Sequence, residues 1–174
     1  MAETLKTIKT RRSVKKYKSD PVPQEIIDKI VEAGLEAANG MAQQASIIIE
    51  VTNKEMRDRL SAMNAAVMGK EGVDPFYGAP VVLVVLAKKS VGTCVYDGSL
   101  TLGNMLLAAH DLGVGACWIH RAKQMFESEE GKAILKDLGI EEEYEGIGNC
   151  VVGYLDGDYP AEKPIKDGRH FVIK

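Results

Sequence analysis

The sequence predicts a single α+β domain in which helices cover both faces of one mixed β-sheet. Its 174 residues are enough for one domain with a substantial core and few for two. Short β-branched segments alternate with segments of helical periodicity in no regular order, which indicates about five strands and about five helices. We therefore expect one three-layer domain over residues 1–174.

Two prolines, Pro21 and Pro23, precede the first strong helix pattern. Apolar and small residues then recur at the spacing of one helix face, and we expect this helix to end at Gly40. The β-branched segment 46–52 (SIIIEVT) predicts a strand directly afterwards. The residues on the apolar helix face are Ile26, Ile27, Ile30, Val31, Gly34 and Ala38.

The middle of the chain contains its most apolar segments. Residues 53–69 predict a helix, and residues 78–89 (GAPVVLVVLAKK) form the continuous apolar run of a strand buried on both faces. Residues 97–113 predict another helix, which is apolar nearly all round from Met105 to Leu112. Such a helix lies either at the centre of the core or at a subunit interface. The apolar face predicted for the helix over 53–69 consists of Met56, Leu60, Met63 and Val67, with the methionines filling the core.

Three later segments predict the remaining strands. They are residues 115–120 (GACWIH), 148–155 (GNCVVGYL) and 169–174 (RHFVIK).

Charge and cysteine content exclude several classes of protein. The net charge of −3 gives no support for nucleic-acid binding, which requires a broad basic face. Cys94, Cys117 and Cys150 lie far apart and lack metal-ligand spacing, so we expect reduced thiols, no metal site and a cytoplasmic protein. The first residues lack the apolar core of a signal peptide, and no apolar run is long enough to span a bilayer.

One short basic segment stands out against the acidic whole. Five cations fall within the eight residues from Arg11 to Lys18, and Ser13 and Tyr17 lie among them. A hydroxyl group among cations is typical of an anion site, whereas a plain charge run is usually a solvated face. Lys16 and Lys18 fit the solvated face.

Other common motifs are absent or out of order. Gly113 and Gly115 follow a predicted helix and precede a strand, which is the reverse of the order in a dinucleotide-binding fingerprint. The three histidines, His110, His120 and His170, form no recognisable catalytic set.

Five segments, in this order along the chain, resemble the nitroreductase family of FMN-dependent oxidoreductases, and in particular its short members. They are RRSVKKY (11–17), EAANGMAQQ (36–44), FYGAPVVLVV (76–85), NMLLAAHDLGVGACWIH (104–120) and YPAEKPIKDGRHFVI (159–173).

The resemblance implies that the basic segment holds FMN. Arg11 and Ser13 would bind the phosphate and ribityl end, with Arg12 close by, because Arg forks and hydroxyls suit a dianionic phosphate. Lys15 would reach the pyrimidine edge of the flavin, where a cation favours the reduced state.

The remaining cofactor contacts implied by the resemblance lie on three other segments. Ile119, His120 and Arg121 would offer a backbone N–H to flavin N5, while the His120 side chain has either a structural role or a place at the ring edge. Arg169, with Lys166 beside it, is a second phosphate candidate; an exposed basic loop is the alternative.

The turn that reaches the cofactor across the family's dimer interface departs from the usual pattern at Ala42, Ala45 and Ser46. The candidates for this contact are therefore Asn39, Gly40 and Met41.

The activity implied is electron transfer from NADH or NADPH, through flavin N5, to a nitroaromatic or quinone acceptor by a ping-pong mechanism. No side chain need act as an acid or base, because the cofactor carries the chemistry. We expect a homodimer with FMN at the subunit interface and with the C-terminal strand, HFVIK, added to the partner's sheet. The alternatives are a flavin-binding redox sensor and a dehalogenase-type reaction, although no insertion is long enough for a dehalogenase lid.

Overall fold

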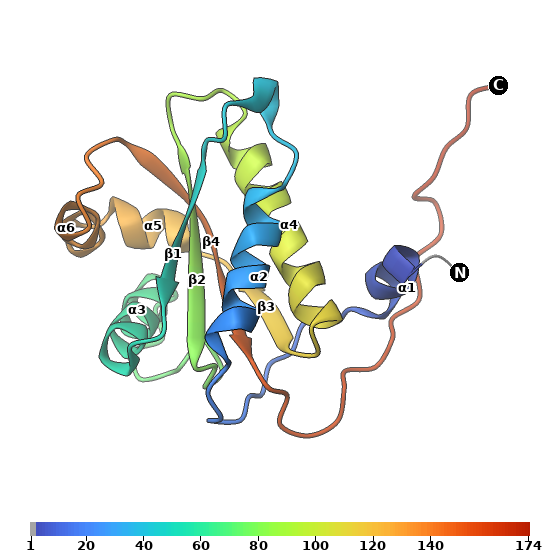
Figure 1. The fold of residues 1–174 in the computed structure, drawn as a ribbon, viewed down its shortest axis with the longest axis horizontal. Helices are drawn as coiled ribbons and strands as arrows, with labels where there is room; N and C mark the ends of the chain where they lie inside the picture. The colour runs from blue at the N-terminus through green and yellow to red at the C-terminus, as the bar shows by residue number, and fades with distance from the viewer. Residues whose placement is uncertain (1–2) are drawn as a thin grey trace.

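A computed structural model describes residues 3–174 and places helices on both faces of one β-sheet (Figure 1). Helices α2 and α4 cover one face, and α3, α5 and α6 cover the other, so the predicted α+β class is confirmed. The elements are α1 (Glu3–Thr10), α2 (Gln24–Leu35), the 3-10 turn η1 (Gly40–Ala42), β1 (Ser46–Val51), α3 (Lys54–Val67), β2 (Val81–Lys88), α4 (Cys94–Asp111), β3 (Gly115–Ile119), α5 (Ala122–Glu127), α6 (Glu129–Asp137) and β4 (Tyr144–Gly153).

The sheet differs from the prediction in two respects. It has four strands in the order β1-β2-β4-β3, where about five were expected, and all strand pairs are antiparallel, where a mixed sheet was expected. Within residues 3–174, the one parallel pairing is an isolated bridge between Ser13 and Ala116. The missing strand is the segment 169–174, which is extended but pairs with nothing in the described chain. After Leu155 the chain runs past α1 and away from the sheet, so this segment lies beside no sheet edge of its own chain (Figure 1).

The core has two halves separated by the sheet, and β2 belongs to both. Val82, Val84 and Leu86 face the cluster under α3, α5 and α6. Val81, Leu83 and Val85 on the same strand face the cluster under α2 and α4. Every residue from Val81 to Ala87 is buried, which confirms the strand predicted to be buried on both faces.

The first predicted helix ends earlier than expected, at Leu35 rather than Gly40. Asn39 is extended, and its side-chain oxygen accepts a hydrogen bond from the Gln44 N–H at 2.9 Å. Such a local side-chain bond favours a turn over a further helical turn.

Helix α4 has a buried face and an unusually apolar outer face. Met105 and Ala109 are buried against the sheet, whereas Leu106 and Leu107 are only half-buried. The outer face continues through exposed Leu100, so the segment that is apolar all round is only partly covered by its own chain. None of the helices in residues 3–174 is both long enough and apolar enough to cross a bilayer.

Candidate functional site

The basic segment lies along the outer edge of β3. The Val14 N–H donates to the Ala116 carbonyl at 3.1 Å, and the Lys18 N–H donates to the Tyr154 carbonyl at 2.9 Å. Val14 and Tyr17 are buried in the core, whereas Ser13 is exposed. These contacts hold the segment against the sheet with Val14 and Tyr17 as its buried anchors, while the side chains of Ser13, Lys15 and Lys16 are exposed.

Arg11 has a property that indicates an anion site. Its Nη1 atom is buried and has no hydrogen-bond partner among residues 3–174. A buried guanidinium nitrogen without an acceptor is unfavourable, and a phosphate oxygen is the acceptor that this group binds best. The residue thus fits the phosphate end of FMN.

The guanidinium of Arg12 is bonded to other groups of the same chain. Its guanidinium donates to the carbonyls of Lys9 at 2.7 Å and Arg11 at 2.8 Å, and it lies 3.7 Å from a Glu162 carboxylate oxygen. These partners hold it against α1 and the start of the C-terminal segment. Its role in the structure is therefore to fix the backbone next to Arg11.

The thiol of Cys117 on β3 is buried and is affected by the basic segment. Burial raises the pKa of Cys117, while Ser13 and the charges of Lys15 and Arg11 act in the opposite direction. The Lys15 ammonium also lies 5.9 Å from the ring centroid of Tyr77.

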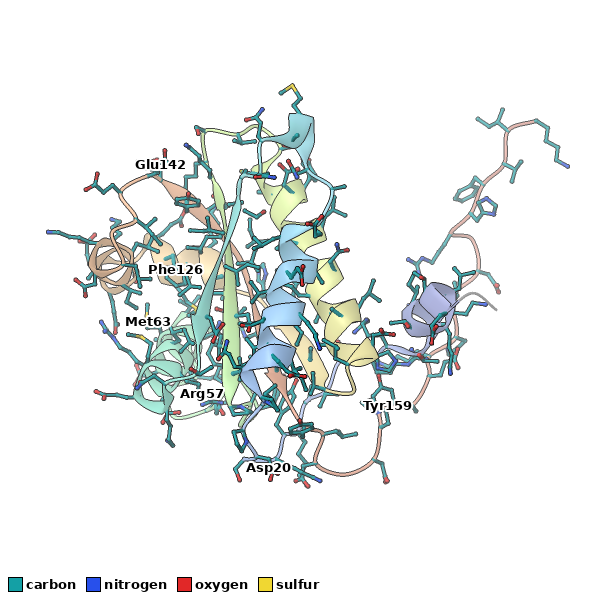
Figure 2. All side chains as sticks on the ribbon, viewed as in Figure 1. Asp20, Arg57, Met63, Phe126, Glu142 and Tyr159 are labelled. Carbon is teal, nitrogen blue, oxygen red and sulfur yellow. The ribbon has the colours of Figure 1, made fainter. Side chains whose placement is uncertain are left out.

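Tyr77 was not among the predicted site residues, and its loop is held by one carboxylate. Asp74 accepts hydrogen bonds from Ser61 at 2.6 Å and from the N–H groups of Phe76 at 2.9 Å and Gly78 at 2.7 Å. Arg57, labelled in Figure 2, pairs with the same carboxylate. The sequence feature that could have indicated Tyr77 as a site residue is the FYG triplet ahead of β2, in which an aromatic residue precedes a glycine.

The residues just after β3 form a sharply fixed turn. The His120 carbonyl accepts a hydrogen bond from the Asn64 amide at 2.8 Å, and the Arg121 Nε donates to the Asn64 oxygen at 3.0 Å. Arg121 has φ 80°, a left-handed conformation that is costly for a residue with a side chain. The side chain of His120 is exposed. Asn64 was also missed at the sequence level, although a polar residue beside Met63 in an apolar helix pattern was a usable signal.

The predicted turn residues Asn39, Gly40 and Met41 lie elsewhere. The Gly40 N–H donates to Asp97 at 3.0 Å, at the N-terminal end of α4, whereas Thr10, next to Arg11, bonds to His110 at its C-terminal end. Asp97 and His110 lie 13 residues apart on α4, which is about 20 Å along the helix axis, so one chain does not bring this turn to the basic segment.

Lys166 and Arg169 are exposed on an extended C-terminal segment, and one chain does not bring them to Arg11 either. The segment is anchored at its start by Tyr159 (Figure 2). The Tyr159 hydroxyl accepts from the Arg12 N–H at 2.8 Å, and its ring stacks on His110.

His110 completes this anchor with both ring nitrogens. One lies 2.8 Å from the Thr10 hydroxyl, and the other lies 3.1 Å from the Tyr159 hydroxyl. Burial lowers the pKa of His110, the charges of Arg11 and Arg12 lower it further, and Asp111 acts against them.

These features define an α+β protein in which a cationic segment lies along one outer edge of the sheet. The model of the nitroreductase family matches residues 8–154 of the chain. A protein of Methanothermobacter thermautotrophicus, named as a candidate NADH dehydrogenase/NAD(P)H nitroreductase, is 36% identical over 121 residues, which is 67% of this chain and 60% of that protein. A protein of the same name from Archaeoglobus fulgidus is 32% identical over 158 residues, covering 88% of this chain and 86% of that protein.

The fold comparison gives the same result over the full length. A solved nitroreductase with bound FMN from Bacteroides fragilis has a TM-score of 0.89 and 28% identity and covers 100% of both chains. The chain belongs to the nitroreductase family, and the predicted family is thereby confirmed.

The pKa of His110 gives a testable pH dependence. Because folding favours neutral His110, the unfolded chain binds the extra proton more readily, and stability falls as the pH drops through the usual histidine range near about 6.5. The thermal midpoint of the FMN-free protein should fall more between about pH 7.5 and pH 5.5 than that of His110→Gln. His170→Gln, on the exposed C-terminal segment, is the control and should behave like the wild type. Identical pH profiles for all three proteins would contradict the assignment.

Proposed function

We propose that this chain is an FMN-dependent oxidoreductase that passes electrons from NADH or NADPH to an electrophilic acceptor of the nitroaromatic or quinone class. The observation that carries the proposal is the buried guanidinium nitrogen of Arg11 beside β3, which has no hydrogen-bond partner among residues 3–174. Membership of the nitroreductase family and the FMN in the Bacteroides fragilis structure supply the identity of the anion.

The residues of the β3 edge have separate tasks. Arg11 and Ser13 bind the phosphate end through charge-assisted and hydroxyl hydrogen bonds. Lys15 places a positive charge at the pyrimidine edge of the ring, next to Tyr77. Bound FMN supplies the electron-carrying chemistry at N5, so the chain needs no acid or base of its own.

We further propose that the active form is a homodimer with the cofactor between subunits. Three features support this assembly: the outer face of α4 is apolar, the strand β1 has a free edge, and the C-terminal segment is apolar and exposed. Residues 170–174 of one copy would add to the sheet of the other, which removes the free edge. The turn at Asn39–Met41 would then reach the cofactor of the partner.

Lys166 and Arg169 have a path to the phosphate within the same proposal. The C-terminal segment starts beside Arg12, because Tyr159 is fixed there. Ten residues of extended chain reach about 30 Å, so the segment is long enough to turn back toward Arg11.

The phosphate assignment predicts that Arg11→Ala weakens FMN affinity by about 1.5–3 kcal/mol, which is roughly tenfold to a hundredfold, as expected for a charge-assisted hydrogen bond. Fluorescence titration of FMN measures the change. Lys16→Ala is the matched control, since Lys16 is exposed and pairs with Asp156. Wild-type affinity in both Arg11→Ala and Ser13→Ala would show that the phosphate binds elsewhere.

The dimer proposal predicts different effects for two exposed leucines. Leu100 is 50% exposed on the outer face of α4, and Leu138 is 54% exposed beyond α6 on the other side of the sheet. Sedimentation at micromolar concentration should give a dimer for the wild type and for Leu138→Asp, and a monomer for Leu100→Asp, because the charge would be buried between subunits. A folded monomer that still binds FMN would exclude an interfacial site.

The ping-pong scheme follows from a single open face of the bound ring. If donor and acceptor occupy that place in turn, initial-rate plots at several acceptor concentrations should be parallel, and a high concentration of either substrate should inhibit. The acceptor should also compete with NAD(P)H for the oxidised enzyme. Intersecting lines without this competition would indicate a ternary complex and a second binding place.

A further inference from the structure

The peptide between His120 and Arg121 is oriented by a buried side chain of another helix. Asn64 on α3 is 0% exposed, and both ends of its amide contact this one turn. Its Nδ2 donates to the His120 carbonyl at 2.8 Å, and its oxygen accepts from Arg121 Nε at 3.0 Å. A second buried amide, Asn149, donates to the preceding carbonyl of Ile119 at 3.3 Å.

The direction of each carbonyl group also determines the direction of the N–H group in the same peptide. The described chain contains no cis peptide bond, and in a trans peptide the carbonyl and the next N–H point in opposite directions. The His120 carbonyl points inward to Asn64, so the Arg121 N–H points away from it. Among residues 3–174, no acceptor pairs with the N–H of His120 or of Arg121.

The turn would not keep this arrangement by default. Arg121 is held at φ 80°, a conformation that the surrounding contacts must impose on a residue with a side chain. The amide of Asn64 is removed from water, and its hydrogen bonds to the turn compensate the free energy that this burial would otherwise cost. A buried polar group of this kind is expected to fix a particular geometry, since an apolar residue would fill the same space more favourably.

We propose that Asn64 is a positioning residue that holds the Arg121 N–H outward as a hydrogen-bond donor for the bound flavin. The inference rests on the proposed function, together with the family resemblance, which implies that the residues after β3 offer a backbone N–H to the flavin. A backbone donor does not titrate, so its direction alone decides whether the contact forms. Asn64 thus acts through the peptide and does not touch the cofactor itself.

The test follows the Arg121 amide by NMR in 15N-labelled protein during titration with FMN. In the wild type, FMN should move this resonance strongly. In Asn64→Leu, which removes the bond to the carbonyl at similar volume, the shift should be lost, while affinity falls only about fivefold to tenfold because the phosphate contacts remain. Asn64→Ser, too short to reach the carbonyl, provides the same comparison if the leucine variant does not fold.

Met125→Leu is the packing control. Its sulfur lies 3.2 Å from the Asn64 amide, yet the substitution leaves the bonds to His120 and Arg121 intact, so the wild-type shift should remain. A wild-type shift in a folded Asn64 variant, or its loss in Met125→Leu, would overturn the positioning role alone. If the wild type binds no FMN, the proposed function is wrong and this inference fails with it. Failure of the proposed function can therefore be distinguished from failure of the positioning role.

Discussion

Burial of β2 on both faces is the constraint from which the rest of the molecule follows. A strand with no wet face needs a helix layer on each side, and α2 with α4 and α3 with α5 supply these layers. Antiparallel pairing then places β1 at one edge of the sheet and β3 at the other. The β3 edge is occupied by the basic segment of the same chain, and the β1 edge has no partner strand within the described residues.

The same packing explains how the flexible side chains of the basic segment come to form a defined site. Val14 and Tyr17 are buried, and the Tyr17 hydroxyl donates to the Val14 carbonyl at 2.7 Å. These two residues fix the segment against the sheet, while Ser13, Lys15 and Lys16 beside them are exposed. Arg11 and Ser13 are therefore positioned by the core rather than by each other, which suits a site built to receive a separate anion.

The sequence predicted the features that depend on local periodicity or on a contiguous motif. Residues 46–51, 81–88 and 54–67 formed the strands and helix that their patterns indicated, and the basic segment assembled at one edge. The residues it missed depend on contacts between distant parts of the chain. Asn64 meets the turn after β3 across 56 positions, and Tyr159 meets Arg12 across 147, so neither local pattern indicates the partner. The prediction of a fifth strand was wrong for the same reason, because an extended segment becomes a strand only where it lies beside a free sheet edge.

The distribution of the predicted site residues has a thermodynamic consequence. One chain assembles the basic edge beside β3, while the Asn39–Met41 turn lies at the opposite end of α4. In the proposed dimer the second copy supplies the turn, so each cofactor contacts both subunits. A ligand that binds the dimer better than the monomer must stabilise the dimer by the same free energy. Cofactor affinity, coverage of the apolar α4 face and pairing of the β1 edge would then be coupled, and each would weaken when either of the others is removed.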